Sequence, residues 1–383
     1  MVAVLVLFSV SVIHPVMAAE ENDKNFGEWT ITPIGAVESL EATSFAMSKT
    51  GVPQVSYYDD ATGSIMYATK AGTAWHTEKV ADSAGTYMTS VAIDPAGNPA
   101  ISFGDGLHFG NLMYAQKNGT HWDSTIVAKG SVGDAGQYSS LAFDAAGNPH
   151  IAYNDGQNFA RLRYASWNAS SKAWEYDVID SGGDLGDTGY NPSLVFDAGG
   201  VPHVAYRDGK KYPSLMYAVK NGANWTTTVV DNGGDITGNT GYSASLALDT
   251  AGNPHIAYYD QKNEVLRYAS WNGTGWKLEW IERNDKAEPY TSLAIDAQNI
   301  PHIGYPEYFQ NKLKYATYNA TFARWDLRLI DTPRDAGKYA KIALDPAGHP
   351  NFIYYDATKY ALNYVTWTAG NPKNHLPHLF PAA

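Results

Sequence analysis

The sequence predicts an all-β protein, a seven-bladed β-propeller made of four-stranded antiparallel blades. Two observations lead to this prediction. A motif of about fifty residues occurs seven times, and its most regular stretch is GNPHIAYYD at 252–260, with near copies at 147–155 and 200–208. The seventh copy lacks its last segment, and a matching segment, FGEWTITPIG, stands before the first copy.

Each repeat contains four short segments with the pattern of β-strands. In the fifth copy they are SLALD, PHIAYYD, VLRYASW and GWKLEWIE, all rich in β-branched or aromatic residues and bounded by Gly, Asn, Asp or Pro. The DTAGNP turn between the first two predicts a tight hairpin. We expect Gly252 to supply a positive φ there and the Asp249 side chain to accept hydrogen bonds from backbone N–H groups.

The N-terminal segment around Trp29 decides between a closed ring and an open array. We predict that residues 26–36 form the fourth strand of the last blade, which closes the ring and leaves no free sheet edge. A Tyr in every third segment and a Trp in every fourth one are expected to pack between blades. They are Tyr67, Tyr114, Tyr164, Tyr217, Tyr268, Tyr315 and Tyr364, and Trp75, Trp122, Trp174, Trp225, Trp276, Trp325 and Trp29.

The predicted domain organisation is simple. Residues 1–19 have an apolar run followed by Pro15 and small residues, as in a secretory signal peptide, so we expect a protein that is secreted or held at the cell surface. The propeller is predicted over 20–369 and a Pro-rich tail over 370–383. The repeats fall near 42–85, 86–136, 137–189, 190–241, 242–289, 290–337 and 338–369, with the closing strand at 26–36.

The net charge of -12 and the pI near 5.3 disfavour nucleic acid and anionic membranes as partners, and they are compatible with neutral sugars or cations. The chain has no cysteine. Five sequons precede the repeated Trp segment and indicate either glycosylation or Asn-containing turns. They are at Asn118, Asn168, Asn224, Asn272 and Asn319.

The repeat resembles that of a family of secreted, mostly uncharacterised bacterial and archaeal β-propeller proteins, whose pattern runs S-L-A-x-D-x-x-G-N-P-H-I-x-Y-Y-D, then L-x-Y-A, then G-x-W. The resemblance spans residues 29–367 and implies the fold. The Asp-box repeats of sialidases, S-x-D-x-G-x-x-W, are a looser likeness. SWNGTGW at 270–276 has Asn in place of the Asp and is one residue short, and SWNASSKAW at 166–174 is too long, so we interpret this likeness as a shared turn.

Candidate binding residues follow the second strand of each repeat. In a propeller the loops from second to third strand, and from fourth strand to the next blade, lie on one face around the central channel, here called the channel face. Ligands often bind there, by analogy between folds. The candidate binding residues on the channel face are Tyr58, Asp59, Asp105, Asp155, Arg207, Asp208, Tyr259, Asp260, Glu307, Tyr355 and Asp356.

Two interpretations of these residues remain open. Tyr rings stack on sugars, and carboxylates accept hydrogen bonds from hydroxyl groups or bind Ca²⁺. An acid repeated in every blade can instead cap the turn that follows it. Catalysis needs an asymmetric arrangement, so the departures Arg207 and Glu307, with His108 and Tyr308 nearby, are the more informative residues. A second tyrosine set at the blade entrances is Tyr87, Tyr138, Tyr190, Tyr242, Tyr290 and Tyr339.

Other polar residues have simpler interpretations. The recurrent His150, His203, His255 and His302 should be spread around the ring, so we expect structural hydrogen bonds rather than a metal site. Arg163 and Arg267 occupy the same repeat position in the third strand. The chain has no catalytic-triad elbow, Walker loop, H-E-x-x-H motif or dinucleotide fingerprint.

The sequence therefore predicts a secreted binding or scaffold module rather than an enzyme. Its expected partner is a glycan or an extracellular or cell-surface protein, recognised by Tyr and Asp side chains without a required cofactor, although Ca²⁺ is compatible with the acids. We expect neither nucleic-acid binding nor membrane insertion. One alternative is a glycan-active hydrolase or lyase that uses Glu307 or a ring Asp with Tyr. Another is a structural surface-layer subunit.

Overall fold

The computed structural model of the protein describes residues 28–37, 40–83, 88–106, 110–130, 135–136, 138–156, 160–182, 187–209, 213–234, 239–282, 289–307, 309, 311–330 and 332–368. The predicted signal peptide and the C-terminal tail lie outside these residues, as do Tyr87, His108 and Tyr308. Trp29–Thr368 forms one compact unit. A search of the described residues finds no helix whose length and hydropathy suit a bilayer crossing.

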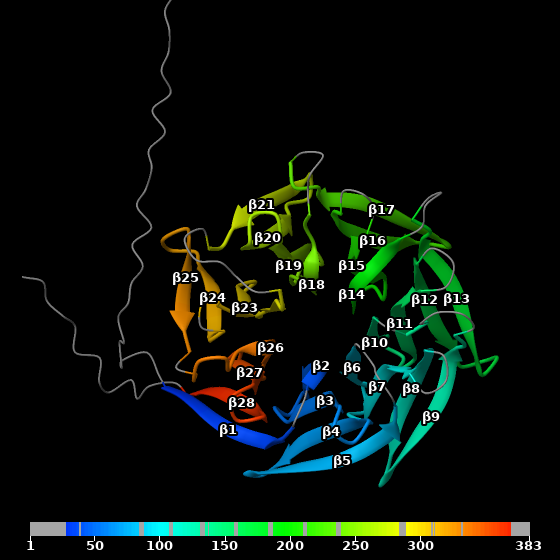
Figure 1. Ribbon diagram of the computed structural model, residues 1–383. Coiled ribbons are helices and arrows are strands. Elements are labelled where there is room, and N and C mark those ends of the chain that lie inside the picture. The colour runs from blue at the N-terminus through cyan, green and yellow to red at the C-terminus, as the bar shows by residue number, and fades with distance from the viewer. Residues whose placement is uncertain are drawn as a thin grey trace, which may run out of the picture. The chain divides into compact units, whose positions relative to one another are not determined.

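The described residues form seven four-stranded antiparallel sheets, as the sequence predicts. We number them as blades one to seven in chain order; Figure 1 shows them around a ring with their first strands innermost. Blade one contains β2 (Leu40–Met47), β3 (Pro53–Asp59), β4 (Ser64–Ala71) and β5 (Ala74–Asp82); blade two contains β6 (Thr89–Ile93), β7 (Pro99–Asp105), β8 (Asn111–Asn118) and β9 (His121–Ala128); blade three contains β10 (Ser139–Phe143), β11 (Pro149–Asp155), β12 (Arg161–Asn168) and β13 (Ala173–Asp180).

The remaining blades repeat this order. Blade four contains β14 (Thr188–Phe196), β15 (Pro202–Asp208), β16 (Leu215–Asn221) and β17 (Asn224–Asp231); blade five contains β18 (Tyr242–Leu248), β19 (Pro254–Asp260), β20 (Val265–Trp271) and β21 (Trp276–Trp280); blade six contains β22 (Ser292–Ile295), β23 (Pro301–Pro306), β24 (Leu313–Asn319) and β25 (Arg324–Leu329); blade seven contains β26 (Lys338–Leu344), β27 (Pro350–Asp356), β28 (Ala361–Thr368) and β1 (Glu28–Ala36).

The N-terminal strand closes the ring. The strand order in blade seven is β26-β27-β28-β1, so the first strand of the chain supplies the outermost strand of the last blade. Figure 1 shows β1 in blue beside β28 in red. The first strands of blades seven and one, β26 and β2, also contact each other. The predicted closure around Trp29 is therefore confirmed.

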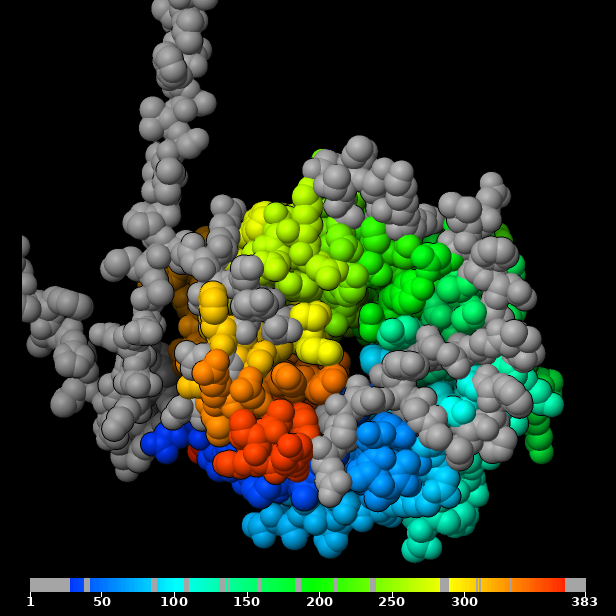
Figure 2. All heavy atoms as spheres, in the orientation of Figure 1, coloured from blue at the N-terminus to red at the C-terminus, as the bar shows by residue number. Residues whose placement is uncertain are grey.

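The hydrophobic core lies between blades rather than within one of them. The buried side chains gather in seven clusters among the described residues, and each cluster draws on two consecutive blades. Figure 2 shows side chains filling the spaces between neighbouring ribbons of the ring. Because every blade is sandwiched between two others, its strands are apolar on both faces.

The repeated Tyr and Trp side chains join each blade to the next. A Tyr of each third strand meets the Trp of the following blade's fourth strand edge to face, with ring centroids from 5.0 Å (Tyr268–Trp325) to 5.8 Å (Tyr315–Trp29) apart, a geometry that aromatic pairs prefer. The seven pairs complete the ring. They are Tyr67–Trp122, Tyr114–Trp174, Tyr164–Trp225, Tyr217–Trp276, Tyr268–Trp325, Tyr315–Trp29 and Tyr364–Trp75.

The recurrent histidines are structural, as expected. His150 Nδ1 is hydrogen-bonded to the hydroxyl of Tyr164 at 2.7 Å, and its Nε2 lies 3.3 Å from Asp144 Oδ2 in the hairpin. Blade one uses Gln54 in place of histidine, and its Oε1 accepts the bond from Tyr67 at 3.0 Å. His203, His255 and His302 bond to Tyr217, Tyr268 and Tyr315 in the same way.

The hairpin between first and second strands is held by its aspartate. Asp249 Oδ1 accepts the backbone N–H groups of Ala251 at 2.9 Å and Asn253 at 2.8 Å, while Oδ2 accepts the Asn253 amide at 2.8 Å. Gly252 has a φ of 82°, which suits glycine. The predicted capping turn is confirmed.

A serine in the first strand of six blades hydrogen-bonds to the next blade. Its hydroxyl oxygen accepts a backbone N–H from the neighbouring first strand, as Ser193 does from Leu246 at 3.0 Å. Blade seven has Lys341 at this position. The six serines are Ser44, Ser90, Ser140, Ser193, Ser245 and Ser292.

Candidate functional site

Most predicted acids on the channel face accept hydrogen bonds from the turn that follows them. Asp208 Oδ1 accepts the N–H of Ser214 at 2.7 Å, and Glu307 Oε1 accepts that of Phe309 at 2.8 Å. Asp356 Oδ1 accepts the N–H groups of Thr358 and Lys359 at 2.9 and 3.1 Å. Asp59 and Asp260 receive bonds from Thr62 and Asn263. These contacts support the interpretation that the repeated acid caps a local turn.

The predicted tyrosines that precede these acids are buried. Tyr58, Tyr259 and Tyr355 are at most 6% exposed and belong to three of the clusters between blades. Asp105 is buried as well, whereas Asp155 and Arg207 are half-buried. The structure therefore does not gather the eleven candidate residues into one pocket. Two of the acids, Asp155 and Asp260, instead contact Arg163 and Arg267 on the third strand of their own blades.

A cavity of about 460 Å³ lies between blades four and five, at their channel-face ends. This volume is within the range of ligand pockets. Blade four contributes residues 229–234, at the end of β17 and in the loop after it. Blade five contributes Asn263, Arg267, Leu278 and Trp280. We call this cavity the Arg267 pocket.

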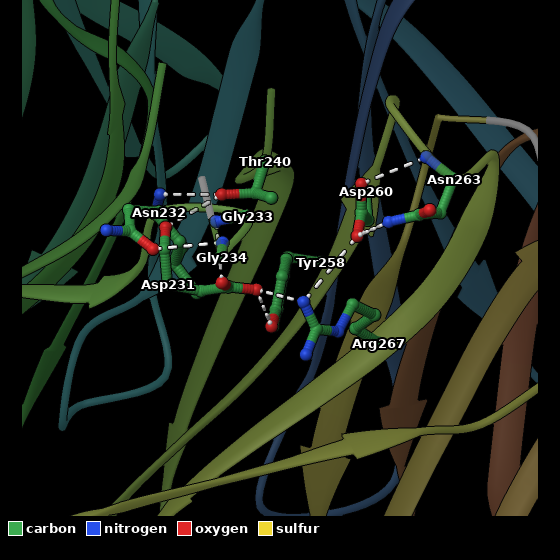
Figure 3. A network of polar contacts seen from close by, with 10 residues as sticks. Asp231, Asn232, Gly233, Gly234, Thr240, Tyr258, Asp260, Asn263 and Arg267 are labelled. Atoms are coloured by element: carbon green, nitrogen blue, oxygen red, sulfur yellow. Dashed lines mark hydrogen bonds and ion pairs between the residues drawn. The ribbon is translucent and has the colours of Figure 1, made fainter. Parts of the chain in front are cut away.

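Arg267 is held between two carboxylates in this pocket (Figure 3). Its Nη1 donates to Asp231 Oδ2 from blade four and lies 3.5 Å from Asp260 Oδ2 of its own blade. Cζ lies 5.2 Å from the ring centroid of Trp280, a cation–π contact. The three charged side chains are 11%, 4% and 0% exposed. The two carboxylates neutralise the arginine and fix its orientation.

Asp231 is the centre of the network. Its Oδ2 also accepts the hydroxyl of Tyr258 at 2.6 Å, and Oδ1 accepts the N–H of Gly233 at 2.8 Å. Burial, followed by the Asp231 carboxylate, raises the pKa of Tyr258 well above its usual value, so the hydroxyl stays protonated and donates. Thr240 Oγ1 donates to the backbone oxygen of Asp231 at 2.8 Å. The pocket wall is therefore preorganised.

The arginine keeps unused donors. Among the described residues only Nη1 of Arg267 is hydrogen-bonded, and Nε is buried without a partner. Asn232 and Asn263 are exposed at the rim and Trp280 is half-buried. A guanidinium, two amides and an indole face can together bind hydroxyl groups and the apolar face of a sugar. Both carboxylates face the same cation.

A second pocket, between blades two and three, has an arginine at the same repeat position, but Ala128 stands where the first pocket has Asp231. It has a volume of about 400 Å³ and is lined by residues 126–129 of blade two and by Tyr153, Arg163 and Tyr176 of blade three. Arg163 pairs in register with Tyr153 as Arg267 does with Tyr258. Its Nη1 lies 3.0 Å from Asp155 Oδ2, and its Nε is also buried without a partner. We call it the Arg163 pocket.

The sequence revealed only part of this site. The shared repeat position of Arg163 and Arg267 is visible in the sequence. The sequence does not predict a role in the site for Asp231, Trp280 or Tyr176. Asp231 precedes Arg267 by 36 positions and belongs to another blade. Among the described residues no three Asp, Glu or His side chains are grouped so as to hold a metal ion.

Searches with protein-family models and among curated protein sequences found no match to this chain. Solved structures do match it. An ulvan lyase of polysaccharide lyase family PL25, bound to -[GlcA(1-4)Rha3S]-, has a TM-score of 0.62 and 13% identity and covers 90% of this chain and 94% of its own. The similarity shows the fold.

Two lectins are also similar. The Aleuria aurantia lectin, solved with Fucalpha1-6GlcNAc, has a TM-score of 0.52 and 12% identity over 79% of this chain and 99% of that one. The SapL1 lectin, solved with alpha methyl fucoside, has a TM-score of 0.52 and 13% identity over 78% and 97%. The structural neighbours of this seven-bladed propeller thus include glycan-binding and glycan-cleaving proteins.

Proposed function

We propose that the protein is a glycan-binding module that holds neutral sugar residues in the Arg163 and Arg267 pockets, outside the cell. The observation that carries this proposal is the pairing of a cavity with an arginine already neutralised by carboxylates. Such an arginine offers hydrogen-bond donors without excess charge, so it favours hydroxyl groups over anions. The lectins among the structural neighbours support a sugar as the ligand.

The two pockets share an arginine at the same repeat position and lie at different blade interfaces of the ring. A branched or repeating glycan, or a glycosylated cell surface, could occupy both at once, which raises the apparent affinity without new contacts. The capping acids of the channel face stabilise the loops beside the pockets. Neither pocket requires a cofactor, and Ca²⁺ at the ring acids is a separate proposal that a chelator tests.

A glycan-array screen of residues 20–383, with Ca²⁺ and again with chelator, tests the proposal. We expect binding to a class of neutral glycans under both conditions, with loss in the Arg267→Met, Arg163→Met double variant. Arg324→Gln is the matched control because it removes an exposed cation, paired with Asp326, from another surface. Loss with chelator alone would assign binding to Ca²⁺. A blank array would contradict the proposal.

The alternative that this protein is a glycan-active hydrolase or lyase is also tested, because an ulvan lyase has a similar fold. After incubation with the protein, a bound glycan should return with an unchanged mass. Fragments of lower mass that disappear in the Arg267→Met, Arg163→Met variant would establish cleavage at the pockets in place of binding.

A further inference from the structure

Arg207 is a half-buried cation on the channel face whose hydrogen-bond partners are neutral. Its Nη2 donates to Asn239 Oδ1 at 3.1 Å and to the Tyr242 hydroxyl oxygen at 3.0 Å. Its Cζ lies 4.0 Å from the centroid of the Tyr242 ring, and its Nε is buried without a partner. Within the described part of the chain, no ion pair joins Arg207 to a carboxylate.

The nearest acids are engaged elsewhere. Asp187 accepts the hydroxyl of Tyr190, and Asp208 accepts the N–H of Ser214. Burial lowers the pKa of Arg207, which means that its surroundings disfavour the positive charge. The Asp208 and Asp187 carboxylates act on this charge without a direct ion pair and offset the effect of burial in part. A partly buried cation without a direct ion pair costs stability. By contrast, Arg163 and Arg267 are both ion-paired.

Aromatic rings flank this cation. The Tyr190 centroid lies 5.9 Å from Arg207 Cζ and 5.8 Å from the ring centroid of Tyr138. All three tyrosines are half-buried and come from the start of blades three, four and five. We call Tyr138, Tyr190, Arg207 and Tyr242 the channel mouth. It combines several aromatic faces with one positive charge that forms no direct ion pair within the described residues.

Strained backbone holds two of these tyrosines in place. Asn191 and Ser243, which follow Tyr190 and Tyr242, have φ values of 48° and 47°, a region that costs energy for residues other than glycine. The register shifts at these points in β14 and β18. A bulge of this kind redirects side chains. Backbone strain at equivalent positions in two blades indicates that the orientation of the tyrosines is maintained against a cost.

We propose that the channel mouth binds the anionic group of an acidic sugar, a carboxylate or a sulfate ester, with the sugar ring against the tyrosines. The planar guanidinium fork matches a pair of oxyanion oxygens, and tyrosine faces suit a pyranose ring. The whole protein carries a charge of -12, so attraction is local and a short oligosaccharide binds better than a long polyanion. Its residues are different from those that line the two pockets between blades.

Isothermal titration of residues 20–383 with three probes tests the site. The probes are tetragalacturonate, its methyl ester, and a sulfated galactan tetrasaccharide without carboxylates. We expect at least one anionic probe to bind and the methyl ester to bind at least about tenfold more weakly than tetragalacturonate if the carboxylate is the group recognised. Binding of the sulfated probe alone would identify a sulfate ester as that group.

Arg207→Gln should lower the affinity for the anionic probe by at least about tenfold. Arg207→Lys should lower it by less, because lysine keeps the positive charge but lacks the planar guanidinium that binds two oxygens at once. Arg324→Gln, at an exposed cation outside both kinds of site, should leave this affinity unchanged. Arg207→Gln breaks no direct ion pair, so the melting temperature should change little, and this checks folding directly. Failure of both anionic probes, or equal affinity in Arg207→Gln, would overturn the proposal.

Discussion

The interface between blades three and four and the interface between blades four and five have the same hydrogen bond and differ in the third-strand residue opposite its tyrosine. Tyr206 donates to Asp180 at 2.7 Å in the first, and Tyr258 donates to Asp231 at 2.6 Å in the second. The third-strand residue opposite the tyrosine is Met216 in blade four and Arg267 in blade five.

The methionine interface shows that the fold does not need a cation here. Asp180 is satisfied by Tyr206, by the N–H of Gly182 at 2.8 Å and by Thr188 Oγ1 at 3.4 Å. Met66 and Met113 occupy the same position in blades one and two. Lys314 of blade six occupies this position too and pairs with Glu282, so a cation here can join two blades; the cavity beside Arg267 is the feature on which the proposed ligand depends.

The largest difference in stability between the two interfaces is expected when the acid is removed from each. Asp231→Ala leaves Arg267, 11% exposed, with Asp260 alone and should cost about 3 to 5 kcal/mol, as for breaking a buried ion pair. Asp180→Ala removes only hydrogen bonds and should cost about 1 to 3 kcal/mol. Urea unfolding measures both. Equal losses of unfolding free energy in the two variants would mean that the charge of Arg267 does not add to the cost of removing Asp231.

The acid sensitivity of the two interfaces should be alike, because both carry a His–Tyr pair. Burial lowers the pKa of His150, His203, His255 and His302. Below about pH 6.5 the folded protein then binds fewer protons than the unfolded chain, so the free energy of unfolding falls as the pH drops through this range and is fully present above it.

Urea titrations between pH 5 and pH 8 measure this loss. His255→Gln, which copies the Gln54–Tyr67 bond of blade one, should make the loss smaller, and His203→Gln should have the same effect. A pH dependence unchanged by either variant would contradict the assignment to these histidines.

Converting one interface into the other should affect binding more than folding. Arg267→Met should cost about 3 kcal/mol, the low end for breaking a buried ion pair, because Asp231 keeps Tyr258 and Gly233 as donors and Asp260 keeps Asn263. Urea unfolding measures the cost and sugar titration measures the loss of the pocket. Met216→Arg, the reverse change, should fold normally beside Asp180. A loss above about 4 kcal/mol for Arg267→Met would make the arginine structural.

The smallest effect is expected at the interface that closes the ring. Lys341 stands where six blades have serine, and burial lowers its pKa to about 8. Lys341→Ser should add about 1 kcal/mol, from a hydrogen bond to β2 and from the loss of a half-buried charge.

The pH dependence of Lys341→Ser checks that reasoning. The folded wild type binds fewer protons at this lysine than the unfolded chain between pH 8 and 10.5, so its stability rises with pH there. The advantage of the variant should therefore be largest at or below about pH 8 and smaller near pH 10. An advantage that grows with pH would contradict this account.

The fold could be predicted because the same four strand patterns and turns occur in every copy of the repeat. The turn of Asp249, the Tyr and Trp pairs and the missing seventh segment near Trp29 each follow from local chemistry and counting. The histidines could be interpreted correctly for the same reason, since a ligand set must converge and a repeated residue in a ring does not.

The site could not be predicted in the same way because it lies between repeats. Asp231 ends one blade and Arg267 belongs to the next, so their contact depends on how blades stack. The available signal was the substitution of arginine for methionine at one repeat position, at Arg163 and Arg267. The acids predicted to bind a ligand, such as Asp356 and Asp208, instead accept hydrogen bonds from the turn that follows them.

The number of sugars bound per chain decides whether the Arg163 and Arg267 pockets each bind a glycan. Isothermal titration with a neutral glycan selected by the array should give two sites for the wild type and one each for Arg163→Met and Arg267→Met. The double variant should bind none while Arg324→Gln retains two. An unchanged number of sites in the double variant would show that the pockets between blades do not bind the glycan.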